Sequence, residues 1–170
     1  MNYQDVRPLI KSGDALAWTH RGWGSWHDIK IQLVRMFTRS EFSHVAVAWV
    51  VGGRVFALEA VQPCVRIYPL SQLGDFYHLP TSQDNPYFRL VWTDDVETFA
   101  LSKVGEPYSQ IQAVLAFFGR SKADRKWECV EYAKTVLHKA GAIVVGDDTP
   151  TDFVYALMAA NIPLTLVKNP

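Results

Sequence analysis

The sequence predicts an α+β protein in which helices pack against one small, mainly antiparallel sheet. Two observations favour this class. Residues 44–51 and 54–61 are apolar, β-rich runs separated by Gly52-Gly53, which is the pattern of a tight β-hairpin. Later segments instead repeat apolar residues at helical spacing, most clearly over 127–140.

Composition limits both the organisation of the chain and its partners. We expect one domain, 1–170, because this length supports a single core and no linker-like segment interrupts it. Seventeen Lys and Arg balance 17 Asp and Glu, so no charged surface for nucleic acid is expected. The chain shows no signal peptide and no transmembrane segment, which predicts a cytoplasmic protein, with a bacterial or phage origin compatible. The oligomeric state is not indicated.

The N-terminal half contains the strands of the hairpin, with one strand and one helix before them. A strand is expected at 15–18, directly after the turn residues Gly13-Asp14. Apolar residues at helical spacing, after a capping box that begins at Ser25, predict a helix from about 26 to 38. The hairpin of 44–51 and 54–61 follows.

Two more strands and two helices are expected in the middle of the chain. The β-rich runs 65–68 and 87–92 predict strands separated by a loop that contains proline and aspartate. Acidic residues precede a helix over about 95–104, and glycines end both this helix and the apolar helix at 111–118.

The last two helices have clear boundaries in the sequence. The helix expected at 127–140 ends at Gly141, a typical C-terminal glycine. Thr149 is the expected N-cap of the final helix, with Pro150 at its first position and Asp152 as capping partner.

The turn length predicts which residues of the hairpin share a face. A two-residue loop pairs Val51 with Arg54 and, counting back, Ala46 with Glu59. His44 and Glu59 then project to the same side as diagonal neighbours, about 7–8 Å apart at the backbone.

The residues between them on this face are small. We define the alanine face by Ala46, Ala48 and Ala57, and we expect the helix that bears Cys129 to pack on it. The opposite face, expected to be core, carries larger apolar residues: Val45, Val47, Trp49, Phe56 and Leu58.

These residues form a possible catalytic constellation. Cys129 lies near a helix N-terminus, where the dipole favours a thiolate and backbone N–H groups can bind an oxyanion. His44 would take the thiol proton and Glu59 would orient the imidazole, as in other nucleophile–base–orienter sites. Each residue also has a structural interpretation, since cysteine is often a small buried hydrophobe. Glu59 is harder to explain structurally, because a carboxylate in an apolar strand needs a partner.

The remaining cysteine and histidines are weaker candidates. Cys64 lies near a strand start, away from any helix N-terminus, and a disulfide between the two cysteines is the alternative to free thiols. His20, His27, His78 and His138 are interpreted as surface residues. No Cys or His spacing indicates a metal site, and no cofactor is expected.

Several short motifs together resemble a known family. In chain order they are Gly13-Asp14, Ser43 to Val47, Ala57 to Ala60, Gly105 to Tyr108, Trp127 to Tyr132 and Thr149 to Phe153. They resemble the circularly permuted branch of the NlpC/P60 superfamily of papain-like cysteine hydrolases, in particular the YiiX/YaeF-like permuted amidases.

The resemblance implies a permuted papain-like fold with a half-barrel sheet, and an amidase or peptidase that forms a covalent acyl-enzyme. It implies Cys129 as nucleophile, His44 as base and Glu59 as the third polar residue, with Tyr108 and Trp127 as substrate-binding residues. The substrate would be a small peptide, an amide or an acyl lipid. Relatives often have a small hydroxyl residue where this chain has Val130.

Two alternatives remain at this point. The same permuted order is found in lecithin:retinol acyltransferase-like proteins, which implies a lipid acyltransferase or thioesterase. Those enzymes usually have a histidine where this chain has Glu59. Aromatic residues for an acyl-chain groove are available at Trp23, Trp26, Phe117 and Phe118. The other alternative is a non-catalytic binding module on the same fold.

Overall fold

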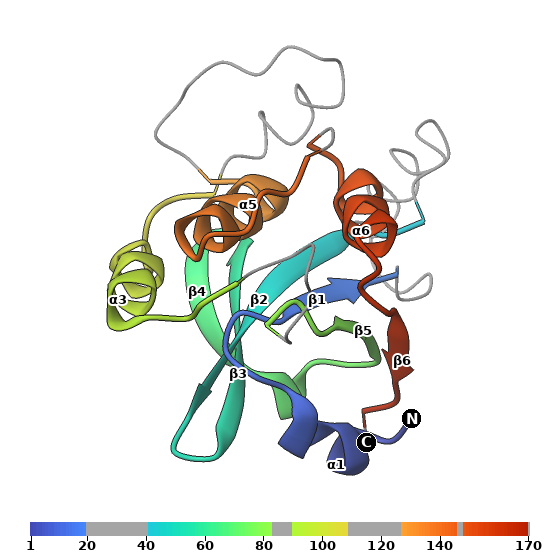
Figure 1. Cartoon of the computed structure of the whole chain (residues 1–170). Coiled ribbons are helices and arrows are strands. Elements are labelled where there is room, and N and C mark those ends of the chain that lie inside the picture. The colour runs from blue at the N-terminus through green and yellow to red at the C-terminus, as the bar shows by residue number, and fades with distance from the viewer. Residues whose placement is uncertain (20–40, 83–89, 109–126, 146–147, 170) are drawn as a thin grey trace.

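A computed structural model of the chain describes residues 1–19, 41–82, 90–108, 127–145 and 148–169. They form an α+β fold around a six-stranded antiparallel sheet with strand order β4-β3-β2-β1-β5-β6, which confirms the predicted class (Figure 1). The strands are β1 (Ala15–Trp18), β2 (His44–Val51), β3 (Arg54–Val61), β4 (Cys64–Pro69), β5 (Phe76–Leu79) and β6 (Thr165–Val167). The helices described are α1 (Tyr3–Val6), α3 (Asp94–Ser102), α5 (Cys129–Lys139) and α6 (Pro150–Ala159), with short 3-10 helices at Arg7–Leu9 and Leu70–Gln72.

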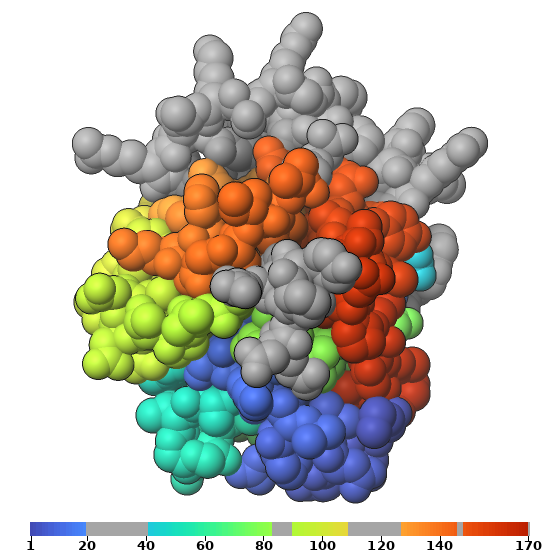
Figure 2. Space-filling view, in the orientation of Figure 1, coloured from blue at the N-terminus to red at the C-terminus, as the bar shows by residue number. Residues whose placement is uncertain are grey.

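Helix α5 is the central helix of the layer that covers the sheet. It packs on β2 and β3, with α3 and α6 on either side of it (Figure 1). The two ends of the chain lie side by side below this layer, where the N–H of Tyr3 donates to the carbonyl of Lys168 at 2.9 Å (Figure 2). Within the described ranges, no helix has the length and apolar character needed to cross a bilayer.

The expectation that α5 packs on the alanine face is wrong. Helix α5 shares a buried cluster with Val45, Val47 and Leu58, on the opposite face. The alanine face packs instead against α1, which contributes Tyr3 and Val6. The larger side chains bury more apolar area against a long helix than alanines do, and the short α1, which the sequence pattern did not predict, fills the remaining space.

Most predicted elements are confirmed with small changes at their ends. The hairpin strands have the predicted bounds, and both turn glycines have positive φ, at 55° and 71°, as a two-residue hairpin turn requires. The side chain of Thr149 accepts a hydrogen bond from the N–H of Asp152, which confirms the cap of α6. Helix α5 begins at Cys129 rather than at 127. The helices predicted at 26–38 and 111–118 lie outside the described residues.

The predicted strand at 87–92 is not supported where the structure describes it. Residues 90–92 form no strand, because the N–H of Val91 donates to the carbonyl of Ala140 in the loop after α5. The sequence pattern also missed β5 and β6, which have four and three residues. Such short strands are defined by their pairing with neighbours more than by their own periodicity.

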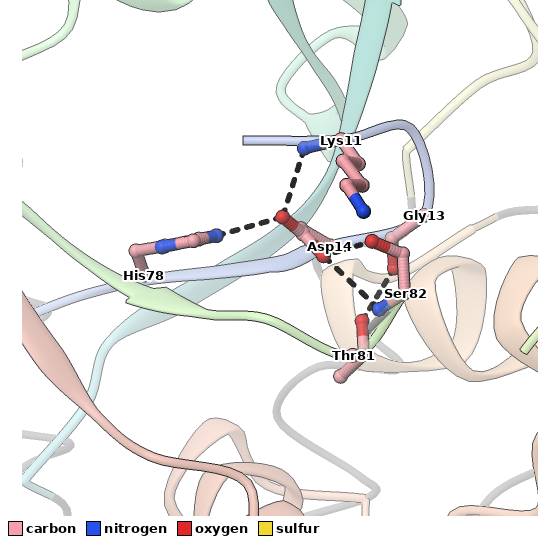
Figure 3. Close-up of polar contacts among 6 residues, drawn as sticks. All are labelled: Lys11, Gly13, Asp14, His78, Thr81 and Ser82. Atoms are coloured by element: carbon pink, nitrogen blue, oxygen red, sulfur yellow. Dashed lines mark hydrogen bonds and ion pairs between the residues drawn. The ribbon is translucent and has the colours of Figure 1, made fainter. Parts of the chain in front are cut away.

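A buried polar network, here called the Asp14 network, holds β1 against β5 (Figure 3). Asp14 is fully buried, and its Oδ2 atom lies 2.7 Å from Nε2 of His78 and accepts the N–H of Lys11 at 2.9 Å. Its Oδ1 atom accepts from the N–H and the hydroxyl of Ser82 at 3.0 and 2.6 Å. His78 is therefore a buried residue of β5, and its interpretation as a surface residue in a loop is wrong.

Gly13 fits tightly beside this network. Its φ of 93° lies in the left-handed region, and a Cβ atom here would come within 2.5 Å of the Leu90 side chain. Its carbonyl accepts a hydrogen bond from the hydroxyl of Thr81 (Figure 3). Only glycine allows the backbone to turn into β1 this close to its neighbours.

Replacing Asp14 with alanine should destabilise the fold strongly. The change leaves His78 and Ser82 without their buried hydrogen-bond acceptor, and each buried polar group left unsatisfied costs about 1–3 kcal/mol. Urea denaturation at neutral pH would measure the free energy of unfolding. The control is Asp5→Ala, which removes an exposed carboxylate. It should change the free energy of unfolding by about 0.5 kcal/mol or less. Equal effects of the two substitutions would show that the network contributes little.

Candidate active site

His44 and Glu59 form a direct contact across the hairpin. The ladder pairs Val51 with Arg54 and Val47 with Leu58, which is the register predicted from the two-residue turn. His44, at the start of β2, and Glu59, near the end of β3, therefore project from the same face. Nε2 of His44 lies 2.6 Å from Oε2 of Glu59.

Glu59 also contacts a second cation, Arg66, which was not among the predicted site residues. The Nε and Nη2 atoms of Arg66 lie 2.8 and 2.7 Å from Oε1 of Glu59. Burial would raise the pKa of Glu59, but hydrogen bonds and charges from His44 and Arg66 lower it overall. The carboxylate is therefore ionised although only 2% of the residue is exposed.

The sequence contained a clue to Arg66. Strands β3 and β4 are joined by the two residues Gln62 and Pro63, so the ladder pairs Glu59 directly with Arg66. An acid and a base opposite each other on neighbouring strands are a favourable pair. The same counting that was applied to the first hairpin would have found this contact.

Helix α5 covers the opposite face of the hairpin, but Cys129 is the first residue of α5 and His44 the first of β2, so the two meet where both elements begin. Cys129 is 8% exposed, and the N-cap residue Glu128 makes no side-chain hydrogen bond to the first turn of the helix. Cys129 is close enough to His44 to contribute to the raised pKa of the imidazole. Since Glu59 occupies Nε2, the ring nitrogen that remains for the sulfur is Nδ1. The structure thus brings together the three residues predicted from sequence.

The surroundings of His44 favour its protonated form. Burial would lower the pKa of His44, but hydrogen bonds to Cys129 and Glu59, together with their negative charges, raise it to about 10. The ring also packs against Trp18, with ring centroids 5.5 Å apart. These contacts favour the imidazolium form of His44.

The two predicted substrate-binding residues are paired through their backbones but differ in their contacts. Burial raises the pKa of Tyr108, with smaller contributions from Cys129 and Glu128, the residues at the start of α5. Trp127 donates its indole N–H to Glu106, and its ring lies 5.5 Å from the ammonium of Lys103. The backbone bridge between Tyr108 and Trp127 explains why α5 begins after Trp127.

Glu128, the residue before Cys129, is a further buried acid. Burial, with the charges of Asp148 and Glu131, raises the pKa of Glu128 to about 7, and Lys134 opposes this shift. Glu128 has no distinctive signal in the sequence, because an acid at a helix start is ordinary. Its burial, which only the fold reveals, favours the neutral form of this acid.

The other candidates do not join this site. Both cysteines are free, and Cys64 is more exposed than Cys129. His138 is exposed, as expected. His20, His27, Trp23, Trp26, Phe117 and Phe118 lie outside the described residues. Among the residues that the structure describes, no group of three or more His, Cys, Asp or Glu side chains is arranged to hold a metal ion.

Comparison with known proteins supports the architecture only. No protein-family profile matches the chain, and no curated protein matches it in sequence. The structure is similar to the crystal structure of the metalloprotein YiiX from Escherichia coli O157:H7, with a TM-score of 0.54 and 22% sequence identity. The match covers 94% of this chain and 89% of that one. The likeness supports a YiiX-like fold.

The charge of His44 should depend on Glu59. In an NMR titration, the His44 ring should stay protonated through neutral pH, and Glu59→Gln should move its pKa down towards the ordinary value because a negative neighbour is lost. Asp5→Asn, a distant change at an exposed carboxylate, should leave the titration unchanged. An unchanged His44 titration in Glu59→Gln would contradict the coupling.

Proposed function

We propose that this chain is a cysteine hydrolase of the permuted papain-like type, acting on an amide, peptide or ester through a covalent acyl-enzyme. The observation that supports this most is the 2.6 Å contact between His44 and Glu59, with Cys129 near the same imidazole. A nucleophile, a base and an orienting carboxylate in this order are the parts that acyl transfer requires.

The first step forms the acyl-enzyme. The Cys129 thiolate attacks the carbonyl carbon, a C–S bond forms, and the carbonyl electron pair moves to oxygen. N–H groups in the first turn of α5, to which Glu128 makes no side-chain hydrogen bond, are available to bind this oxyanion. When the oxyanion collapses, the bond to the leaving nitrogen or oxygen breaks, and His44 donates its proton to that atom.

The second step releases the acid product. His44, now neutral, takes a proton from a water molecule that attacks the acyl carbon, and the C–S bond breaks to regenerate the thiolate and the imidazolium. Glu59 holds Nε2 throughout, so Nδ1 keeps facing the sulfur. Tyr108, near the start of α5, is the residue we assign to the substrate-binding wall. A small panel of acyl-amide and ester probes would identify the class of bond that is cleaved.

Alkylation should distinguish an activated cysteine from an ordinary one. Iodoacetamide near neutral pH should label Cys129 faster than Cys64, because the thiolate is the reactive species. Exposure alone gives the opposite order, since Cys129 is buried and Cys64 is not. Peptide mass spectrometry over a time course would give both rates. Faster labelling of Cys64 would count against Cys129 as the nucleophile.

Substitutions at the site should separate the nucleophile from the orienting group. Cys129→Ala should abolish turnover of the best probe and keep the fold, because the change removes little packing. Glu59→Gln should lower turnover by about 10- to 100-fold, the usual effect of losing an orienting partner. Wild-type turnover in Glu59→Gln, beside an inactive and folded Cys129→Ala, would remove Glu59 from the mechanism. Full activity of Cys129→Ala would overturn the proposed function itself.

A further inference from the structure

Arg66 contacts Glu59, but the proposed mechanism gives it no role. It lies on β4 directly opposite Glu59, and two of its nitrogens contact Oε1, whereas His44 contacts Oε2. Each carboxylate oxygen of Glu59 therefore contacts a different basic side chain.

The guanidinium of Arg66 also packs against an aromatic ring. Its central carbon lies 4.6 Å from the centroid of the Tyr68 ring, a cation–π distance. The Arg66 side chain is 39% exposed and that of Glu59 only 3%, so Arg66 reaches from solvent into the buried end of the pair. An ordinary surface ion pair has both partners in water and contributes little to stability. This pair differs because one partner is a buried carboxylate.

We propose that Arg66 is a positioning residue, whose guanidinium keeps Glu59 ionised and fixes its carboxylate so that Oε2 faces Nε2 of His44. The proposal rests on the proposed function, because positioning matters only if His44 acts on Cys129. With Oε1 held by two N–H groups, the carboxylate cannot rotate away from the imidazole. With a cation beside it, the carboxylate stays charged in a site that would otherwise favour its neutral form.

Substitutions can separate the two parts of this role, which are keeping Glu59 ionised and fixing the position of its carboxylate. Arg66→Gln removes the charge, whereas Arg66→Lys keeps a charge but cannot reproduce two contacts that converge on Oε1 from one plane. Arg54→Gln is the matched control, since it removes the same charge from an exposed position at the start of β3. All four proteins can be compared for fold by circular dichroism before any measurement.

Arg66→Gln should shift the acid limb of the pH profile for Cys129 alkylation upward by about one pH unit. Opposite charges at this range lower a carboxyl pKa by about 1–3 units, and the partial exposure of Arg66 reduces the effect. Turnover at neutral pH should fall about 10-fold, as for other residues that hold an orienting group. Arg66→Lys should restore the acid limb but not the full turnover, and Arg54→Gln should change neither.

Direct titration of the Glu59 carboxyl by carbon-13 NMR makes the test independent of activity. Its pKa should rise in Arg66→Gln and remain low in Arg54→Gln. An unmoved Glu59 titration and acid limb, in a wild-type protein that turns over its probe, would overturn the role of Arg66 alone. Absence of Cys129-dependent turnover in the wild type would overturn the proposed function, whatever the titration shows.

Discussion

The register of β2 against β3 is the constraint on which the candidate site depends. A two-residue turn fixes it, and a slip by one residue would move either His44 or Glu59 to the other face of the sheet. The same device is used again between β3 and β4, where two residues join the strands and place Arg66 opposite Glu59. Two tight turns thus align an imidazole, a carboxylate and a guanidinium across three neighbouring strands.

Charge balance explains why this alignment is stable. A buried carboxylate is costly unless it is paired and hydrogen-bonded, and Glu59 has a different cation at each oxygen. The raised pKa of His44 means that its pairing adds stability fully below the unfolded value of about 6.5, and that this is lost as pH rises through about 10. The lowered pKa of Glu59 means that its contribution is present above its unfolded value and is lost in acid. The charged arrangement is therefore most stable at mildly acidic pH, between the unfolded pKa values of Glu59 and His44, about 4.5 and 6.5.

Strand β1 connects this site with the rest of the scaffold. At its start, the buried Asp14 network joins it to β5, and at its end Trp18 packs against the ring of His44. The strand lies between β2 and β5 in the sheet, so a displacement of β1 would affect the imidazole directly. The network lies outside the candidate site but supports the position of the base through a single short strand.

Local patterns in the sequence determined the hairpin, its register, the cap of α6 and the cysteine at the start of a helix, because each depends on residues a few positions apart. The contact between His44 and Glu59 followed from turn length alone. The face that α5 covers, the burial of His78 and Glu128, and strands β5 and β6 depended on contacts between segments far apart in the chain. Helix α5 could pack on either face of the hairpin as far as periodicity shows, and only the tertiary structure, by burying the larger side chains, decided between them.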